Sequence, residues 1–309
     1  MTTAVTPVAG ARTDAGTRFG VLAVLAATTC WGLGGVLGKS VGASGLVVTF
    51  YRLWIAAVLL NVVLVVMRRR LTWDVLKWSW LGGVCFGLNV ALYFTSVRMT
   101  SIANVAIIGS LTPVIVFPIA VKWMGERVTR KAIVCSALAI AGVMVVVLAG
   151  GSSGQRALSG DLLAVVNLVS WAAFFLVTKH ARKGVGTLEY LAAMTLVAAL
   201  TVTPIALLTG QDFGSVEGLG WLWLVLLVLI PGAAGHGLMT WAHAHVDVST
   251  SSVLVLGEPV LATIAAAVFL SESVNPVQML GMAGVVAALA VLAVAESDTV
   301  EPEPVAAAT

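Results

Sequence analysis

Stretches of about 20 residues without a charged side chain recur along the whole chain, and they constrain its fold more than any other feature. A helix that crosses the hydrocarbon core of a membrane needs about 20 mostly apolar residues. Seven uncharged stretches have this size: 19–38, 78–97, 99–121, 132–155, 162–178, 190–211 and 273–295. Three more contain one ionisable residue each: 45–67 with Arg52, 219–242 with His236, and 248–270 with Glu258. The sequence therefore predicts an all-α polytopic membrane protein with ten transmembrane helices.

The composition excludes most other classes of protein. Of the 309 residues, 60% are hydrophobic and only 10% are charged, against roughly 25% charged in ordinary soluble domains. So few charges cannot cover a water-soluble surface, and so many apolar residues exclude a disordered chain. The net charge of +3 gives no reason to expect a nucleic-acid partner. Continuous apolar stretches also exclude a β-barrel, whose strands alternate in polarity.

No metal, cofactor or catalytic centre is predicted. Cys30, Cys85 and Cys135 fall inside predicted spans and have no metal-ligand or CxxC spacing. The glycine-rich stretch 32–39 lacks the spacing of a phosphate-binding loop. An intramembrane enzyme would need Asp, His or Ser clustered at catalytic spacing near one interface, and the sequence has no such cluster. We therefore expect a protein that is not an enzyme.

The distribution of Lys and Arg predicts the orientation, because cytoplasmic loops are rich in these residues. Ten spans put both termini on one side of the membrane. That side receives thirteen basic residues: Arg12, Arg18, Arg68, Arg69, Arg70, Lys77, Lys122, Arg127, Arg130, Lys131, Lys179, Arg182 and Lys183. The other side receives only Lys39, Arg98 and Arg156. We expect a multi-pass protein of the cytoplasmic membrane with both termini in the cytoplasm.

The two halves of the chain resemble each other. Trp31 and Lys39 have the same spacing as Trp171 and Lys179, at an offset of 140 residues. An offset of 146 matches 101–129 with 247–275 and places Pro113 on Pro259 and Glu126 on Glu272. Because each half has five helices, an odd number, the second half must enter the membrane from the opposite side. Inverted repeats of this kind are common in secondary transporters. The alternative is that the repeat reflects only gene duplication and helix packing, without a transport function.

The repeat sets the expected organisation of the chain. We expect a disordered cytoplasmic N-terminus at 1–17, a first repeat at 18–149, an outer linker at 150–160, a second repeat at 161–295 and a disordered acidic tail at 296–309.

Short motifs recur in equivalent positions of the two halves. They are Leu111–Thr112–Pro113 with Gly125–Glu126–Arg127–Val128–Thr129, Gly257–Glu258–Pro259–Val260 with Ser271–Glu272–Ser273, Tyr51–Arg52, and Trp31. In these motifs the halves resemble the paired EamA domains of the drug/metabolite transporter superfamily, over about residues 20–295. One departure is Ser271, where that family usually has Gly. The resemblance implies a central cavity lined by helices 1, 3, 4, 6, 8 and 9, with helices 5 and 10 packed away from it. It also implies export or exchange of small metabolites such as amino acids.

Glu258 is the first candidate for transport chemistry. It lies 11 residues after Asp247 and 14 before Glu272, and therefore near the middle of its span. A charged carboxylate at the bilayer centre costs about 2.5–3.5 kcal/mol, so ionisable residues at this depth usually have a function, and proton binding is one. The alternative is a protonated side chain that only bonds backbone groups freed by Pro259.

Several polar and aromatic residues accompany Glu258 as candidates. Thr250 and Glu258 share one helical face, and the offset of 146 maps them onto Asn104 and Thr112. Arg52 is a candidate partner for an anionic group of the substrate; the alternative is that its side chain reaches to the outer membrane interface. His236 is a candidate for protonation near neutral pH; the alternative is a packing role. The substrate-binding or coupling candidates are Glu258, Trp31, Asn89, Tyr93, Asn104, Thr112, Trp171, His236, Thr250 and Arg52; the kink or gating candidates are Pro113 and Pro259. For the polar and aromatic residues, ordinary helix packing is the alternative.

Residues at the predicted ends of helices have simpler expected roles. We expect Glu126 and Glu272 to cap or pair with nearby loop groups without touching cargo. We expect His243 and His245, at the cytoplasmic end of their span, to be solvated.

Together these features predict a secondary active transporter. It exports a small metabolite, an amino acid or related compound or a drug-like molecule, by alternating access, with protons as a candidate coupling ion. The expected partners are a small-molecule substrate and the lipid bilayer, and monomer and homodimer both remain open. The first alternative is an uncoupled facilitator or exchanger of small metabolites. The second is a membrane scaffold or subunit without transport, which leaves Glu258 and the inverted repeat unexplained.

Overall fold

The computed structural model describes residues 14–100, 102–149, 158–270 and 274–298, and within them every regular element is a helix. Ten stretches of the described chain are long and apolar enough to cross a membrane. They are Gly16–Ser40, Gly45–Val66, Trp73–Ser96, Ile107–Met124, Arg130–Ala149, Leu158–Ala181, Thr187–Leu208, Gly220–Ala242, Val248–Phe269 and Pro276–Ala295. The predicted ten-helix membrane fold is confirmed.

The first half of the chain builds spans 1 to 5. Its helices are α1 (Asp14–Gly32), α2 (Gly34–Ser40), α3 (Gly45–Val66), α4 (Trp73–Met99), α5 (Ile102–Gly109), α6 (Thr112–Ile119), the π-helix η1 (Ala120–Met124) and α7 (Arg130–Ala149). Span 1 consists of α1 and α2, and span 4 consists of α5, α6 and η1.

The second half builds spans 6 to 10. Its helices are α8 (Leu158–Ala181), α9 (Thr187–Leu208), the short 3-10 helix η2 (Phe213–Ser215), α10 (Gly220–Leu227), the π-helix η3 (Val228–Gly235), α11 (His236–Ala242), α12 (Val248–Leu254), the 3-10 helix η4 (Val255–Gly257), α13 (Glu258–Leu270) and α14 (Pro276–Asp298). Span 8 consists of α10, η3 and α11, and span 9 consists of α12, η4 and α13.

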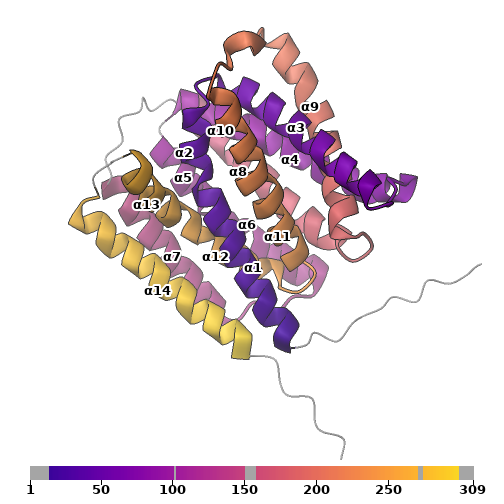
Figure 1. The fold of residues 1–309 in the computed structure, drawn as a ribbon. Helices are drawn as coiled ribbons and strands as arrows, with labels where there is room; N and C mark the ends of the chain where they lie inside the picture. Colours follow the sequence, from indigo (N-terminus) through magenta and orange to yellow (C-terminus); the bar gives the residue numbers. More distant parts are fainter. Residues whose placement is uncertain (1–13, 101, 150–157, 271–273, 299–309) are drawn as a thin grey trace, which may run out of the picture.

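The two ends of the bundle are distinguished by the termini. α1 begins and α14 ends at the same end of the bundle (Figure 1), as an even number of spans requires. We call this end the terminal face; it also carries the connections at 67–72, 125–129, 182–186 and 243–247. The other end is the opposite face, with the connections at 41–44 and 209–219.

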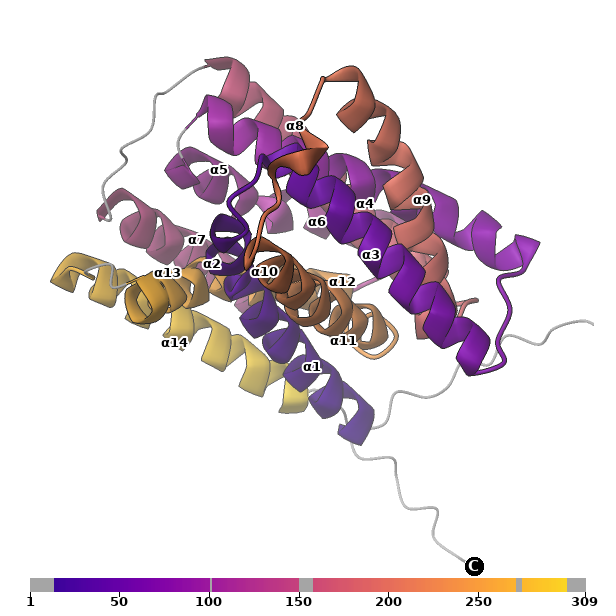
Figure 2. The same ribbon diagram turned by 45° about the horizontal axis from the view of Figure 1, so that its top comes forward.

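The two halves interlock and do not form separate domains. α4 of the first half packs extensively against both α8 and α9 of the second half, and α3 lies along α9 (Figure 2). α7 and α14, the last span of each half, pack against each other at one side of the bundle (Figures 1 and 2). Two repeat-related pairs, α3 with α9 and α7 with α14, are therefore neighbours, and the second of these pairs stands away from the centre.

Glycines allow the close contact between α4 and α9. A Cβ atom added at Gly83 would lie 2.7 Å from the carbonyl oxygen of Met194 and 2.5 Å from Cβ of Val197. One added at Gly87 would lie 2.9 Å from the carbonyl oxygen of Ala198. Small residues let membrane helices approach in this way, so that van der Waals packing holds them together.

Four of the ten spans are interrupted in the membrane, namely spans 1, 4, 8 and 9. Proline accounts for three of the interruptions, because it has no N–H to donate to the preceding turn. Pro113 follows the break between α5 and α6, Pro259 follows η4, and Pro231 lies within η3. Span 1 contacts both η3 of span 8 and η4 of span 9, so the irregular backbone of these spans is gathered inside the protein.

The close approach of α4 to α9 predicts that adding one methyl group at Gly83 lowers the stability of the protein. Gly83→Ala should destabilise the protein by about 1–3 kcal/mol, because backbone and not only side chain must move to admit the Cβ. The unfolding temperature in detergent measures the change. Gly284→Ala in α14 is the matched control, since an added Cβ there meets no atom within 4 Å. Equal unfolding temperatures of the two variants would contradict this account of the contact.

Candidate functional site

Each half of the chain contributes an ionisable residue to the interior of the bundle. Arg52 lies on α3 of the first half, and Glu258 is the first residue of α13, directly after the 3-10 segment that interrupts span 9. The two groups are close enough for their charges to interact. His236, the first residue of α11, lies within the field of Arg52, and Tyr93 of α4 within that of Glu258. Four spans from both halves therefore contribute to one group of side chains, which we call the central cluster.

Three side chains of the central cluster are not fully covered by protein. Tyr93 exposes 39% of its surface, and Arg52 and Glu258 are only partly buried. A ligand that reaches this part of the bundle would therefore find free surface on all three side chains.

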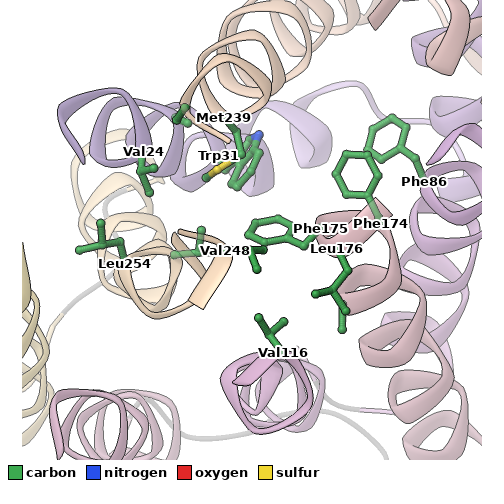
Figure 3. Close-up of a cluster of buried hydrophobic side chains, with 14 of the residues drawn as sticks. Val24, Trp31, Phe86, Val116, Phe174, Phe175, Leu176, Met239, Val248 and Leu254 are labelled. Carbon is green, nitrogen blue, oxygen red and sulfur yellow. The ribbon is translucent and has the colours of Figure 1, made fainter. Parts of the chain in front are cut away.

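Aromatic rings surround His236. Its ring centroid lies 4.9 Å from that of Trp31 and 4.6 Å from that of Phe86. The ring centroids of Phe174 and Trp171 lie 6.0 and 6.5 Å from that of His236. Figure 3 shows Phe86 and Phe174 side by side, with Trp31 above Phe175 in the same interior. The imidazole and Arg52 also line one narrow cavity, so the aromatic wall adjoins the charged groups.

The two repeat-related tryptophans contact each other. The rings of Trp31 on α1 and Trp171 on α8 are 5.4 Å apart at an interplanar angle of 72°. This edge-to-face geometry is favourable for aromatic pairs. The indole nitrogen of Trp31 also donates a hydrogen bond to the carbonyl oxygen of Pro231, 3.1 Å away in η3. Trp31 therefore joins span 1 to the irregular part of span 8.

A buried amide pair joins the halves beside the aromatic wall. The side-chain nitrogen of Asn89 on α4 donates to the side-chain oxygen of Asn167 on α8 at 2.7 Å. Sequence reasoning selected Asn89 and missed Asn167. A signal was present, because Asn167 precedes Trp171 by four residues and so shares its helical face.

The remaining polar candidates lie on the interrupted spans 4 and 9. Thr112 is buried and donates to the carbonyl oxygen of Gly109 at 2.7 Å, and Thr250 is buried in α12. Asn104 belongs to α5, but its side chain lies outside the described part of the structure. The predicted polar stripe from Thr250 to Glu258 assumed one continuous α-helix, and this assumption was wrong: η4 lies between the two residues and changes the helical phase.

Glu126 caps a helix of the other half at the terminal face. Its two carboxylate oxygens accept hydrogen bonds from the backbone N–H groups of Val248 (2.9 Å) and Ser249 (3.1 Å), and the Ser249 hydroxyl donates at 2.6 Å. Gly125, with φ of 70°, turns the chain so that Glu126 reaches these groups. The expected capping role of Glu126 agrees with the structure, whereas Glu272 lies outside the described residues.

A second contact between the halves lies at the same face. Nη1 of Arg69 donates to Oε1 of Glu189 at 2.8 Å, joining the connection before α4 to the first turn of α9. Tyr190, Phe175 and Ser251, close to the ends of α9, α8 and α12 at the terminal face, are fully buried. The contacts of Glu126 and Arg69 therefore hold the two halves together at the terminal face.

The expectation of a solvated His243 was wrong. Its side chain is only 1% exposed and packs edge-on against Phe175, with ring centroids 5.0 Å apart. Neither ring nitrogen has a hydrogen-bond partner among the described residues. Burial, assisted by the positive charges of Lys179 and Arg182, lowers the pKa of His243 to about 3. The ring is therefore neutral at physiological pH.

Comparison with known proteins adds to this geometry. Residues 18–148 and 158–294 match the EamA-like transporter family. The chain is 28% identical over 273 residues to an uncharacterized transporter of Archaeoglobus fulgidus, covering 87% of this chain and 94% of that relative. It is 27% identical over 233 residues to the uncharacterized transporter YwfM of Bacillus subtilis, covering 71% and 75%. A solved crystal structure shares the fold with a TM-score of 0.78 at 20% identity, over 90% of this chain and 97% of that chain.

The cap of α12 predicts a loss of stability in Glu126→Gln. The amide of Gln keeps one acceptor oxygen and turns a donor toward a backbone N–H, which should destabilise the protein by about 1–3 kcal/mol. Thermal unfolding in detergent measures the effect. Glu217→Gln is the control, because Glu217 is exposed on the connection at 209–219. The cap has no importance for stability if both variants unfold at the wild-type temperature.

The buried His243 predicts a pH-dependent stability. The unfolded chain protonates this residue below its ordinary pKa of 6.5, whereas the folded protein resists protonation down to a pH of about 3. The stabilisation is therefore complete above pH 6.5 and is lost as the pH falls toward 3, by up to about 1.4 kcal/mol per pH unit. Unfolding temperatures between pH 4 and 7 should fall less steeply in His243→Leu than in the wild type. Met239→Leu, a change at a buried residue of α11 one turn before His243, should keep the wild-type slope; parallel profiles for all three proteins would refute the interpretation.

Proposed function

The chain belongs to the EamA-like transporter family, and from this membership and the central cluster we propose that it is a secondary active transporter. It exports a small zwitterionic metabolite, an amino acid or related compound, across the cytoplasmic membrane. Transport proceeds by alternating access, and Glu258 carries the coupling proton.

The meeting of Arg52 and Glu258 in the interior carries this proposal. A zwitterion presents a carboxylate for the guanidinium of Arg52 and an ammonium group for the carboxylate of Glu258. Ionisable groups within a membrane are costly and usually serve substrate or ion pathways. Trp31, Trp171 and Phe86 supply an apolar wall beside the charges. Such a wall suits the side chain of an amino acid or the apolar part of an amphipathic compound.

Unequal packing within the inverted repeat supports alternating access. α4 (span 3) packs closely on α9 (span 7), whereas their repeat mates, span 8 and α3, pack much less extensively. Exchanging the two arrangements would loosen the contact of α4 with α9 and tighten that of span 8 with α3. The terminal face would then open and the opposite face would close. The interrupted spans 1, 4, 8 and 9 supply bends at which such a change can occur.

The excess of Lys and Arg identifies the terminal face as cytoplasmic under this proposal. The structure would then be closed to the cytoplasm, with Glu126 and Ser249 as part of the closure. Substrate released from the central cluster would leave through the opposite face.

Counterflow in proteoliposomes tests the coupling role of Glu258. Amino acids, purines and amphipathic drugs are first screened by ligand-dependent thermal shift, and a hit is used as the radiolabelled substrate. Wild-type transport driven by a pH gradient should exceed transport without one. Glu258→Gln should lose this dependence, because it cannot release a proton, and should retain exchange of substrate for substrate.

Glu217→Gln, a change of the same kind at an exposed position, should behave as the wild type. An unchanged pH dependence in Glu258→Gln removes Glu258 as the coupling site. Equal wild-type transport with and without the gradient favours an uncoupled facilitator or exchanger.

A further inference from the structure

A long apolar groove runs along the junction of α7 and α14, away from the central cluster. It has a volume of about 810 Å³, and Val134, Leu138 and Gly142 of α7 face Gly281, Gly284 and Val291 of α14 across it. Arg130 and Lys131, the first two residues of α7, line the groove at the terminal face. Both basic side chains are exposed.

The groove is longer than one leaflet of the hydrocarbon core is thick. Its lining on α7 extends from Arg130 to Val145, which corresponds to about 22 Å at a rise of 1.5 Å per residue. Half of the hydrocarbon core is about 15 Å thick. A groove that begins at the charged interface and continues over this length can hold an extended acyl chain.

We propose that this groove binds an anionic phospholipid. The phosphate lies between Arg130 and Lys131, and an acyl chain follows the apolar groove between α7 and α14. Charge and polarity change along the groove in the order that such a lipid requires, with two cations at the interface and apolar lining beneath them. The proposal is independent of the substrate and coupling of the transporter.

A second copy of the chain fits this surface less well. Copies inserted in the same direction are related by an axis along the membrane normal, so equal residues meet at equal depth. Arg130 and Lys131 of one copy would then face the same two cations of the other, and such like-charge contacts are unfavourable. A lipid phosphate neutralises these cations.

Two variants separate the charged end of the groove from its apolar part. Arg130→Gln with Lys131→Gln removes the headgroup contact on an exposed surface without disturbing packing. Gly284→Leu fills the groove, because a Cβ atom added at Gly284 meets no atom within 4 Å. Arg68→Gln with Arg70→Gln is the charge control, since both residues are exposed on the terminal face and neither lines the groove.

Native mass spectrometry of the full chain in detergent, with added dioleoylphosphatidylglycerol or dioleoylphosphatidylcholine, tests the proposal. The wild type should retain the anionic lipid preferentially, and the Arg130/Lys131 variant should lose about 25-fold in that preference, at about fivefold per cation. The Arg68/Arg70 control should keep it. Gly284→Leu should reduce retention of both lipids.

Other outcomes overturn the proposal. If the Arg68/Arg70 control loses the preference for the anionic lipid equally, the general surface charge attracts the lipid and no specific site exists. Full competition by glycerophosphate, together with normal lipid retention in Gly284→Leu, means a phosphate site without a lipid chain. A dimer that Gly284→Leu dissociates, with no lipid retained by the wild type, means that a second copy occupies the groove.

Discussion

Backbone hydrogen bonding is the constraint on which the rest of this structure depends. In the hydrocarbon core no water is present to satisfy a free N–H or C=O group, so irregular backbone is tolerated only where protein or an internal cavity surrounds it. The chain follows this rule closely. α7 and α14, which stand at the side of the bundle, are uninterrupted, while spans 8 and 9 are interrupted where they contact span 1. The interruption in span 9 places Glu258 at the start of α13, close enough to Arg52 for their charges to interact.

The second organising feature is that the two halves have the same order of helices but pack differently. Glycines on α4 hold the first half tightly to α9, and no equivalent close packing joins span 8 to α3. Under the proposed alternating access, the packing seen here is one of two related arrangements of the duplicated chain. The hydrogen bonds from Trp31 to Pro231 and from Asn89 to Asn167 keep the centre connected. Both bonds join different spans, so they fix the relative position of helices and not only local geometry.

Sequence reasoning predicted the fold and the family, because apolar length, charge distribution and repeated motifs are local and additive signals. It also selected Trp31, Trp171, Arg52, Glu258 and His236, which the structure brings near one another. It did not predict that Arg52 and Glu258 meet, because they come from different halves, over 200 residues apart. It was wrong where helix regularity or loop exposure was assumed: η4 breaks the stripe below Glu258, and Phe175 covers His243. Both depend on contacts between distant residues, which hydropathy does not record.

The cap formed by Glu126 has a thermodynamic consequence for any motion at the terminal face. Its three hydrogen bonds lie where the membrane ends and water begins. When the contact separates, water can take over the carboxylate and the two N–H groups, so each bond is exchanged for another at a net cost of about 1.5–3 kcal/mol, the range for hydrogen bonds to a charged group. An apolar seal of similar strength would expose surface on opening and would respond strongly to temperature. A polar contact at this face is specific in its geometry, and water can replace each of its bonds when it separates, as the proposed alternating access would require.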